Sequence, residues 1–121
     1  MEQILYGQPV ANLLDEVTKK NIQIYLNKNG NSPTLTAITV GDNPASLLYV
    51  SRKEDKAKEL GVNFNWVKLP DDSSSEDVLS VIESSKKTSQ GIIVQLPLPS
   101  QLNFEEIVNL IPSNLDVDGL T

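Results

Sequence analysis

Residues 34–60 read as a strand, a turn and a helix in direct succession. The first seven of them are rich in β-branched side chains, which favour a strand. Gly41 begins a turn, Asn43 can cap the free amides of the following helix, and Pro44 suits the first helical position because its missing N–H would be unpaired there anyway. A left-handed Gly61 is expected to end the helix. This unit predicts a strand that delivers a helix at its carboxyl end.

The rest of the chain continues the alternation of strands and helices. Apolar spacing predicts helices at about 9–28 and 75–87, a last helix from the Asn103 cap to Pro112, and strands at 62–68 and 91–94. This alternation favours an α/β fold, with a mostly parallel sheet and helices on both faces in three layers. Ligands of such sheets bind beyond the carboxyl ends of the strands. The loops that follow the first and third strands are therefore expected to meet.

Composition narrows the possible chemistry. The 121 residues contain no cysteine and no histidine, and the formal net charge is −6. Disulfides, thiolate metal sites and the commonest general base are thus excluded, and the acidic balance argues against nucleic acid as a partner. No apolar run is long enough to enter a membrane as a spanning helix, and no signal-peptide pattern opens the sequence. We expect a single domain over residues 1–121 and a cytoplasmic location.

One face of the helix at 44–60 carries residue types that chemistry would need. Tyr49 and Lys53 are four residues apart and so share a face. The buried side is expected to contain Leu47, Val50 and Ala57. From spacing alone, a solvated basic face is the favoured interpretation. The functional alternative is an aromatic platform beside a lysine that transfers protons.

Two later segments could take part in a site. Residues 95–99 leave the third strand as a stiff and largely apolar segment, because two prolines restrict the backbone, and Gln95 supplies one amide. Asp116 and Asp118 lie in a turn near the last residues. Taken alone, the first segment is a plain loop and the second a solvated turn with a weak metal signal. No glycine-rich nucleotide-binding signature is present.

Together, residues 41–53 (GDNPASLLYVSRK), 91–99 (GIIVQLPLP) and 116–119 (DVDG) resemble the bifunctional methylenetetrahydrofolate dehydrogenase/cyclohydrolases in order and spacing. The resemblance covers essentially the whole chain and implies the N-terminal, folate-binding catalytic domain of a two-domain enzyme. Tyr6 and Gln8 depart from the family, which usually has Asp and Lys there. Members continue into a dinucleotide-binding domain, so the resemblance implies that the NAD(P)-binding domain is absent from this chain.

The resemblance assigns catalytic roles to three residues. Tyr49 would stack on the aromatic system of the folate, Lys53 would serve in proton transfer, and Gln95 would position and tune that lysine. The first two are the residues that spacing alone left as a solvated face. Their combination with Gln95 and Asp118 is what favours catalysis.

Tyr49, Lys53 and Gln95 are also expected to bind the substrate, and the remaining carried-over residues concern binding alone. The wall of the folate cleft would be formed by Leu96, Pro97, Leu98 and Pro99. Asp118 would hydrogen-bond the pterin ring, and Asp116 is a second candidate for that contact. NADP or NAD would be bound by the domain missing from this chain, and no metal is expected.

The implied reactions belong to one-carbon metabolism and purine biosynthesis. Hydride leaves 5,10-methylenetetrahydrofolate for NADP or NAD, and water opens 5,10-methenyltetrahydrofolate to 10-formyltetrahydrofolate. The complete enzyme would be a homodimer with tetrahydrofolate substrates, whereas the isolated chain would be a monomer without dehydrogenase activity. The alternative is a non-catalytic binding or assembly module that keeps the fold. A phospho-receiver domain ranks third, because no acidic pair precedes the first strand's loop in the expected way.

Overall fold

The computed structural model describes the backbone of residues 2–116 and the side chains of residues 16–116. Strands and helices alternate along it as the sequence predicts. In chain order the elements are α1 (Glu2–Asn29), β1 (Thr34–Val40), α2 (Pro44–Leu60), β2 (Asn63–Leu69), α3 (Ser75–Thr88), β3 (Gly91–Val94), α4 (Phe104–Val108) and the short 3₁₀ helix η1 (Ser113–Leu115).

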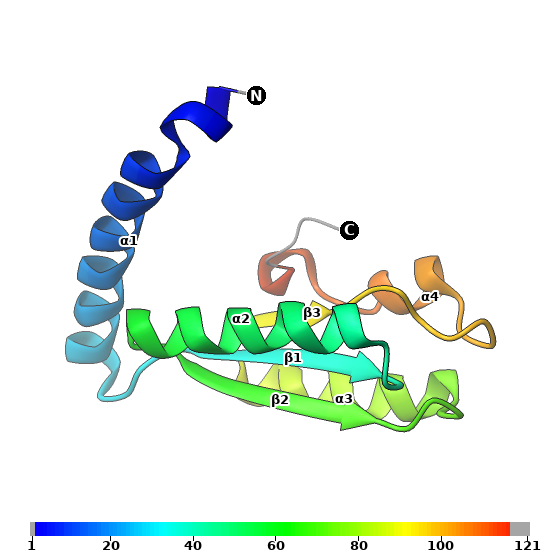
Figure 1. Ribbon diagram of the computed structural model, residues 1–121. Helices are drawn as coiled ribbons and strands as arrows, with labels where there is room; N and C mark the ends of the chain where they lie inside the picture. Colours follow the sequence, from blue (N-terminus) through cyan, green and yellow to red (C-terminus); the bar gives the residue numbers. More distant parts are fainter. Residues whose placement is uncertain (1, 117–121) are drawn as a thin grey trace.

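The sheet is parallel, with its three strands in the order β2–β1–β3 (Figure 1). The connection from β1 to β2 and the connection from β2 to β3 therefore run in opposite directions across the sheet. Crossovers of one handedness that run in opposite directions place their helices on opposite faces. Accordingly, α2 covers one face, while α3 and α4 cover the other. The predicted three-layer α/β fold is confirmed.

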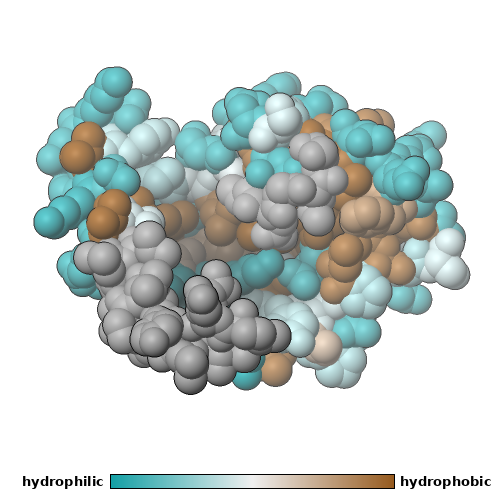
Figure 2. All heavy atoms as spheres, turned by 90° about the horizontal axis from the view of Figure 1, so that it is seen from above, coloured by the Kyte–Doolittle hydropathy of each residue, from teal (hydrophilic) through white to brown (hydrophobic). Residues whose placement is uncertain are grey.

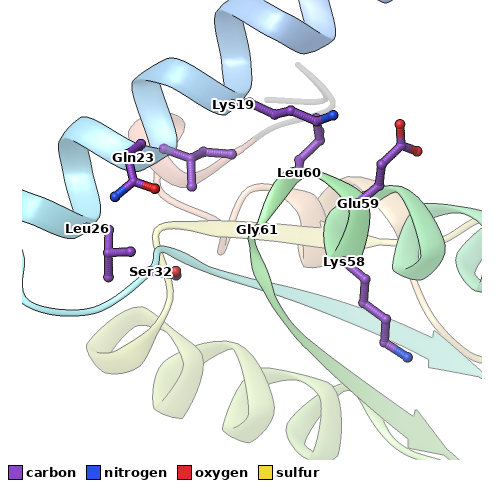
Figure 3. Close-up of a pocket in the computed structure, with 9 residues that line it drawn as sticks. Lys19, Gln23, Leu26, Ser32, Lys58, Glu59, Leu60 and Gly61 are labelled. Atoms are coloured by element: carbon purple, nitrogen blue, oxygen red, sulfur yellow. The ribbon is translucent and has the colours of Figure 1, made fainter.

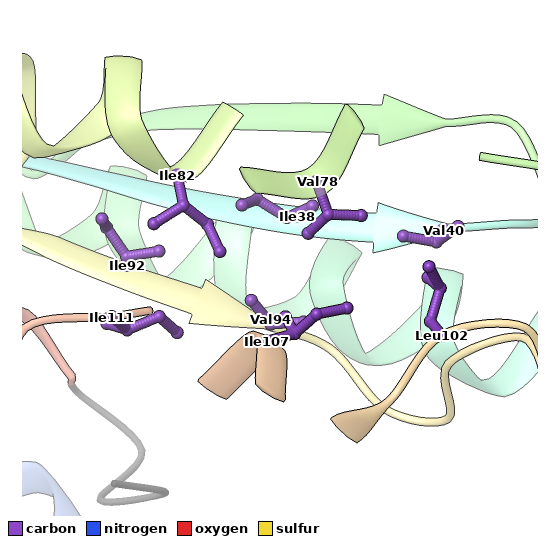
Figure 4. Close-up of a cluster of buried hydrophobic side chains, with 9 residues drawn as sticks. All are labelled: Ile38, Val40, Val78, Ile82, Ile92, Val94, Leu102, Ile107 and Ile111. Carbon is purple, nitrogen blue, oxygen red and sulfur yellow. The ribbon is translucent and has the colours of Figure 1, made fainter. Parts of the chain in front are cut away.

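The central strand β1 is buried on both faces. Ile38 and Val40 point toward α3 and α4, where they join the larger apolar cluster (Figure 4). Ala37 points the other way and packs with Val50 of α2 and Ile93 of β3. Alternate side chains of a strand face opposite sides, so a strand covered on both faces buries nearly all of its side chains. The buried residues of the larger cluster are Ile38, Val40, Val78, Ile82, Ile92, Val94, Leu102, Ile107 and Ile111.

The predicted bounds of α2 are confirmed at both ends. The Asn43 side chain accepts a hydrogen bond from the backbone N–H of Ser46 at 3.0 Å, and Pro44 is the first helical residue. Gly61 ends the helix in the left-handed region, with φ of 84°. The N–H of Val62 donates to the carbonyl of Ala57 at 2.8 Å, which satisfies an otherwise unpaired carbonyl of the last turn.

The buried side of α2 follows the expected spacing with one difference. Val50 and Ala57 are buried, whereas Leu47 is only half-buried. Because Val62 belongs to the helix-ending motif, β2 begins one residue later than predicted, at Asn63.

Two predicted helix bounds are wrong. The first helix begins at Glu2 rather than near residue 9, so it runs through Pro9. A proline lacks the N–H of a regular helical turn, which is why spacing alone favoured a later start. The last helix ends at Val108 rather than at Pro112. There the N–H of Ile111 donates to the carbonyl of Val108, only three residues back, and this tighter turn accompanies the burial of Ile111 in the core.

Gly41, directly after β1, is expected to be sensitive to substitution. Its φ is +88°, and an added Cβ would lie 2.6 Å from Asp71 Oδ1. Gly41→Ala should lower the free energy of unfolding by about 1–2 kcal/mol through the left-handed conformation, with a further loss from displacing the Asp71 carboxylate. Gly30→Ala is the matched control, because Gly30 has a φ of +82° in open space. If urea unfolding showed the same loss of unfolding free energy for Gly41→Ala and Gly30→Ala, a contribution from the contact with Asp71 would be contradicted.

Candidate functional site

Adjacent strands β1 and β3 send their following segments to opposite faces of the sheet. The chain after β1 enters α2 on one face, and the chain after β3 leads to α4 on the other (Figure 1). The N–H of Gln95 donates to the carbonyl of Ile38 at 3.0 Å, so the exit from β3 begins alongside β1. Such a point of divergence is where open α/β sheets bind ligands. The topology thus predicts a ligand crevice between α2 and residues 95–99.

Lys53 and Gln95 meet across this point. The Lys53 Nζ atom donates to Gln95 Oε1 at 3.1 Å, although the two residues are 42 positions apart in the chain. Both residues are half-buried. An amide oxygen that accepts from an ammonium group fixes its position without neutralising its charge. The structure therefore brings these two predicted residues together, and their catalytic roles stay predictions.

A second contact joins the same two segments about two turns nearer the start of α2. The Ser46 hydroxyl donates to the carbonyl of Leu96 at 3.0 Å, and the Gln95 Nε2 atom donates to that same carbonyl at 3.3 Å. Ser46 is not among the site residues predicted from the sequence. The available signal was its spacing, because Ser46 precedes the apolar Val50 by four residues and so lies on the buried side of an amphipathic helix.

Tyr49 lies between these contacts along α2 and leaves half of its surface, 51%, exposed. Leu96 and Pro97 are also exposed, and the peptide bond between them is cis. Pro99 is half-buried, while the half-buried Leu98 packs against the hydrophobic core. Half of the predicted wall is therefore open to a ligand, and the lining role of the four residues stays a prediction.

Hydrophobic surface gathers near this end of the molecule. Figure 2 shows brown residues on the upper face, at the end that carries α4 in Figure 1. Large exposed hydrophobic residues of the segments at this end include Leu48, Leu96 and Phe104. An aromatic ring with exposed aliphatic neighbours suits a flat, partly apolar ligand.

Of the two predicted ligand-binding aspartates, the structure describes Asp116. Asp116 forms a parallel backbone bridge with Ile92 of β3, and its Oδ1 atom is buried. Asp118 lies outside the described residues. Ligand binding by Asp118, with Asp116 as the second candidate, stays a prediction.

A separate cleft of about 300 Å³ lies between α1 and the C-terminal end of α2 (Figure 3). Of the predicted site residues that the structure describes, none lines it. Its lining consists of Lys19, Ile22, Gln23, Leu26, Ser32, Lys58, Glu59, Leu60 and Gly61. Within the described part of the chain, no three His, Cys, Asp or Glu residues group as metal ligands. In that same part, no helix is both long enough and apolar enough to cross a membrane.

Residues 5–118 match the family model of the tetrahydrofolate dehydrogenase/cyclohydrolase catalytic domain. The chain belongs to this family. The match includes the whole of the first two segments on which the resemblance rests, and the third up to Asp118. The predicted crevice between α2 and residues 95–99 therefore lies within a tetrahydrofolate dehydrogenase/cyclohydrolase catalytic domain.

Individual members of the family resemble the chain over nearly its whole length. The bifunctional protein FolD of Lactobacillus acidophilus is 38% identical over 123 aligned positions, which cover 100% of this chain and 43% of that protein. FolD of a Chelativorans species is 39% identical, and the alignment covers 98% of this chain and 40% of that protein. The chain thus spans only about two fifths of the length of these relatives.

Solved structures show the same fold. The Campylobacter jejuni bifunctional enzyme FolD, a methylenetetrahydrofolate dehydrogenase/cyclohydrolase, superposes with a TM-score of 0.88 at 33% identity, covering 95% of this chain and 41% of that one. The 5,10-methylenetetrahydrofolate dehydrogenase of the silkworm Bombyx mori superposes with a TM-score of 0.86 at 31% identity. The superposition covers 93% of this chain and 40% of that one. In both cases the tetrahydrofolate dehydrogenase/cyclohydrolase domain seen here corresponds to less than half of the solved chain.

Proposed function

We propose that residues 1–121 form the folate-binding catalytic domain of an enzyme that interconverts 5,10-methylene-, 5,10-methenyl- and 10-formyltetrahydrofolate. The contact between Lys53 Nζ and Gln95 Oε1 carries this proposal. It lies where β1 and β3 diverge, beside the exposed Tyr49 ring. Membership in the dehydrogenase/cyclohydrolase family supports the assignment to folate.

Lys53 is the proposed proton-transfer group. Hydrolysis of the methenyl group requires a proton to leave the attacking water and a proton to reach the ring nitrogen that departs. Histidine and cysteine are absent from the chain, so lysine, tyrosine and carboxylates are the candidate groups. Lys53 is half-buried and held by Gln95 Oε1, which positions its amino group at the crevice. Gln95 would act by fixing the direction of the Lys53 amino group.

Substrate binding is assigned to the surfaces on either side of this pair. The exposed ring of Tyr49 offers a platform for the flat aromatic part of a folate. Leu96 and Pro97 would contact the ligand from the opposite segment. Asp118 is proposed to hydrogen-bond the pterin ring, with Asp116 as the second candidate.

The start of α2, beside the proposed site, does not suit the phosphates of a dinucleotide. A helix start that binds phosphate must offer free backbone N–H groups. At the start of α2, Pro44 has no N–H and the N–H of Ser46 is already bonded to the Asn43 side chain. NADP or NAD, which supplies the hydride acceptor when bound, is therefore assigned to segments of the enzyme outside this chain. The isolated chain is expected to show no dehydrogenase activity.

The proposal extends to the complete enzyme. The family resemblance implies a cytoplasmic homodimer that takes part in purine biosynthesis, with the isolated chain as a monomer. Light scattering of the chain and of the complete enzyme tests the oligomeric states.

Titration of the ¹⁵N-labelled chain with a non-reactive folate analogue tests the binding site. Amide shifts centred on Tyr49 and Gln95 are expected, because these residues flank the crevice. An absence of binding at millimolar analogue would favour a non-catalytic module that keeps the fold.

Replacing the Tyr49 ring should weaken analogue binding selectively. Tyr49→Leu is expected to raise the dissociation constant about 3- to 10-fold, because an aromatic pair contributes about 0.5–1.5 kcal/mol beyond its buried area. Tyr49→Phe keeps the ring and should bind within about twofold of the unmodified chain. Val17→Ala, at a similarly exposed hydrophobic position on α1, controls for general loss of surface. An unchanged constant for Tyr49→Leu would rule out stacking on Tyr49.

A further inference from the structure

A chain of hydrogen bonds leads from Ser46 to Lys53 through the exit of β3. The Ser46 hydroxyl donates to the Leu96 carbonyl at 3.0 Å, and the Gln95 Nε2 atom donates to that carbonyl at 3.3 Å. At the other end of the same amide, Gln95 Oε1 accepts from Lys53 Nζ at 3.1 Å. A carbonyl oxygen has two lone pairs and can accept both bonds.

The orientation of the Gln95 amide matters because its two ends are chemically opposite. With Nε2 on the Leu96 carbonyl, the acceptor Oε1 faces the amino group of Lys53. The reverse orientation would present N–H donors to an ammonium group, which has no acceptor. Whatever holds the Leu96 carbonyl in place therefore also selects the orientation that suits Lys53.

We propose that Ser46 is a positioning residue for Lys53. Its hydroxyl fixes the Leu96 carbonyl, the carbonyl orients the Gln95 amide, and the amide oxygen holds the lysine. The inference rests on the proposed function of Lys53 and names a residue that acts through two others. Ser46 itself is not a catalytic residue.

The Ser46 hydroxyl has no role in capping its own helix. Ser46 is the third helical residue, and its backbone N–H is already bonded to the Asn43 side chain. Its hydroxyl instead reaches a carbonyl 50 residues away, and only 5% of the residue is exposed. A buried hydroxyl is costly unless it is hydrogen-bonded, so the Leu96 carbonyl is held from a well-packed position on α2.

A comparison of Ser46→Ala with Ser73→Ala tests the inference without any substrate. Ser73 is also 5% exposed, and its hydroxyl also donates to a loop carbonyl, that of Pro70, at 2.7 Å. Hydrogen exchange of the Gln95 side-chain amide, followed by NMR, should become about tenfold faster in Ser46→Ala, which corresponds to the loss of about one hydrogen bond. Ser73→Ala and Ser46→Thr should leave it unchanged. Equal exchange in Ser46→Ala and Ser73→Ala would overturn the proposal.

Turnover by the complete enzyme provides the second readout. Ser46→Ala should lower kcat for methenyltetrahydrofolate hydrolysis about tenfold and leave KM within about twofold, since the lysine is misplaced while the binding surfaces remain. Ser46→Thr keeps the hydroxyl and should restore kcat to within about threefold. An unchanged kcat in Ser46→Ala would overturn the inference. Failure of the unmodified enzyme to bind or hydrolyse folate would instead overturn the proposed function, while the exchange measurement would still decide the role of Ser46.

Discussion

Lys53→Met is expected to lower the rate of methenyltetrahydrofolate hydrolysis by about 10²- to 10⁴-fold in the complete enzyme, the range that a positioned proton-transfer group supplies. Methionine keeps most of the apolar stem, so packing along α2 should change little. Binding of a folate analogue should stay within about threefold, because Tyr49 and residues 95–99 are intact. The measurements are kcat from a spectrophotometric assay and the dissociation constant from calorimetry.

Lys58→Met is the matched control. Lys58 is an exposed lysine on the same helix, and it lies in the last turn, away from Gln95. Its replacement removes the same charge and should leave kcat within about twofold, because surface changes of this kind are usually small. If Lys53→Met retained full turnover, the proton would have to move through another group.

Ile38→Ala is expected to cause the largest loss of stability, about 3–4 kcal/mol of the free energy of unfolding. Ile38 is fully buried in the middle strand, where it joins side chains from α3, α4 and β3 (Figure 4). Truncation removes apolar contacts and leaves a cavity that neighbours on two helices can fill only partly. Urea unfolding followed by circular dichroism should show a lower midpoint with an unchanged slope.

Ile24→Ala makes the same chemical change at a surface position. Ile24 lies on α1 and is 62% exposed. Its replacement should alter the free energy of unfolding by no more than about 0.5 kcal/mol. Similar losses for the two variants would mean that the central strand does not form the core described here.

The residues of these two predictions, Lys53 and Ile38, are connected through Gln95. Ile38 anchors the middle strand, and its backbone carbonyl also accepts the N–H of Gln95. The position of Gln95 against Lys53 therefore depends on how β1 and β3 are paired. A partial loss of that pairing would be expected to lower turnover before the chain unfolds.

Short-range features could be predicted closely from the sequence. The bounds of α2 and β3 agree with the prediction, and so do the Asn43 cap and the left-handed Gly61. Each depends on neighbours within a few residues, because caps and left-handed turns are local chemistry. The misplaced end of α4 has a different cause, since the turn that follows it accompanies the burial of Ile111 against distant residues.

The approach of α2 to Gln95 could also be expected, since parallel strands deliver their following loops to one edge. Spacing could place Tyr49 and Lys53 on one face, yet it could not distinguish a solvated face from a site. The resemblance supplied that distinction, and membership in the family is confirmed by the match over residues 5–118. The match leaves the roles of individual residues as predictions.

By itself, the sequence determined the alternation of strands and helices, the ends of α2, and the residue types available for proton transfer. Only the tertiary structure decided that β1 lies between β2 and β3, and hence which side chains touch across 42 and 50 residues of chain. Ser46 illustrates the difference, because nothing in its local sequence indicates a bond to the Leu96 carbonyl. The physical reason is range: capping and periodicity act over a few residues, whereas that bond exists only after the strands have paired and α2 has packed on them.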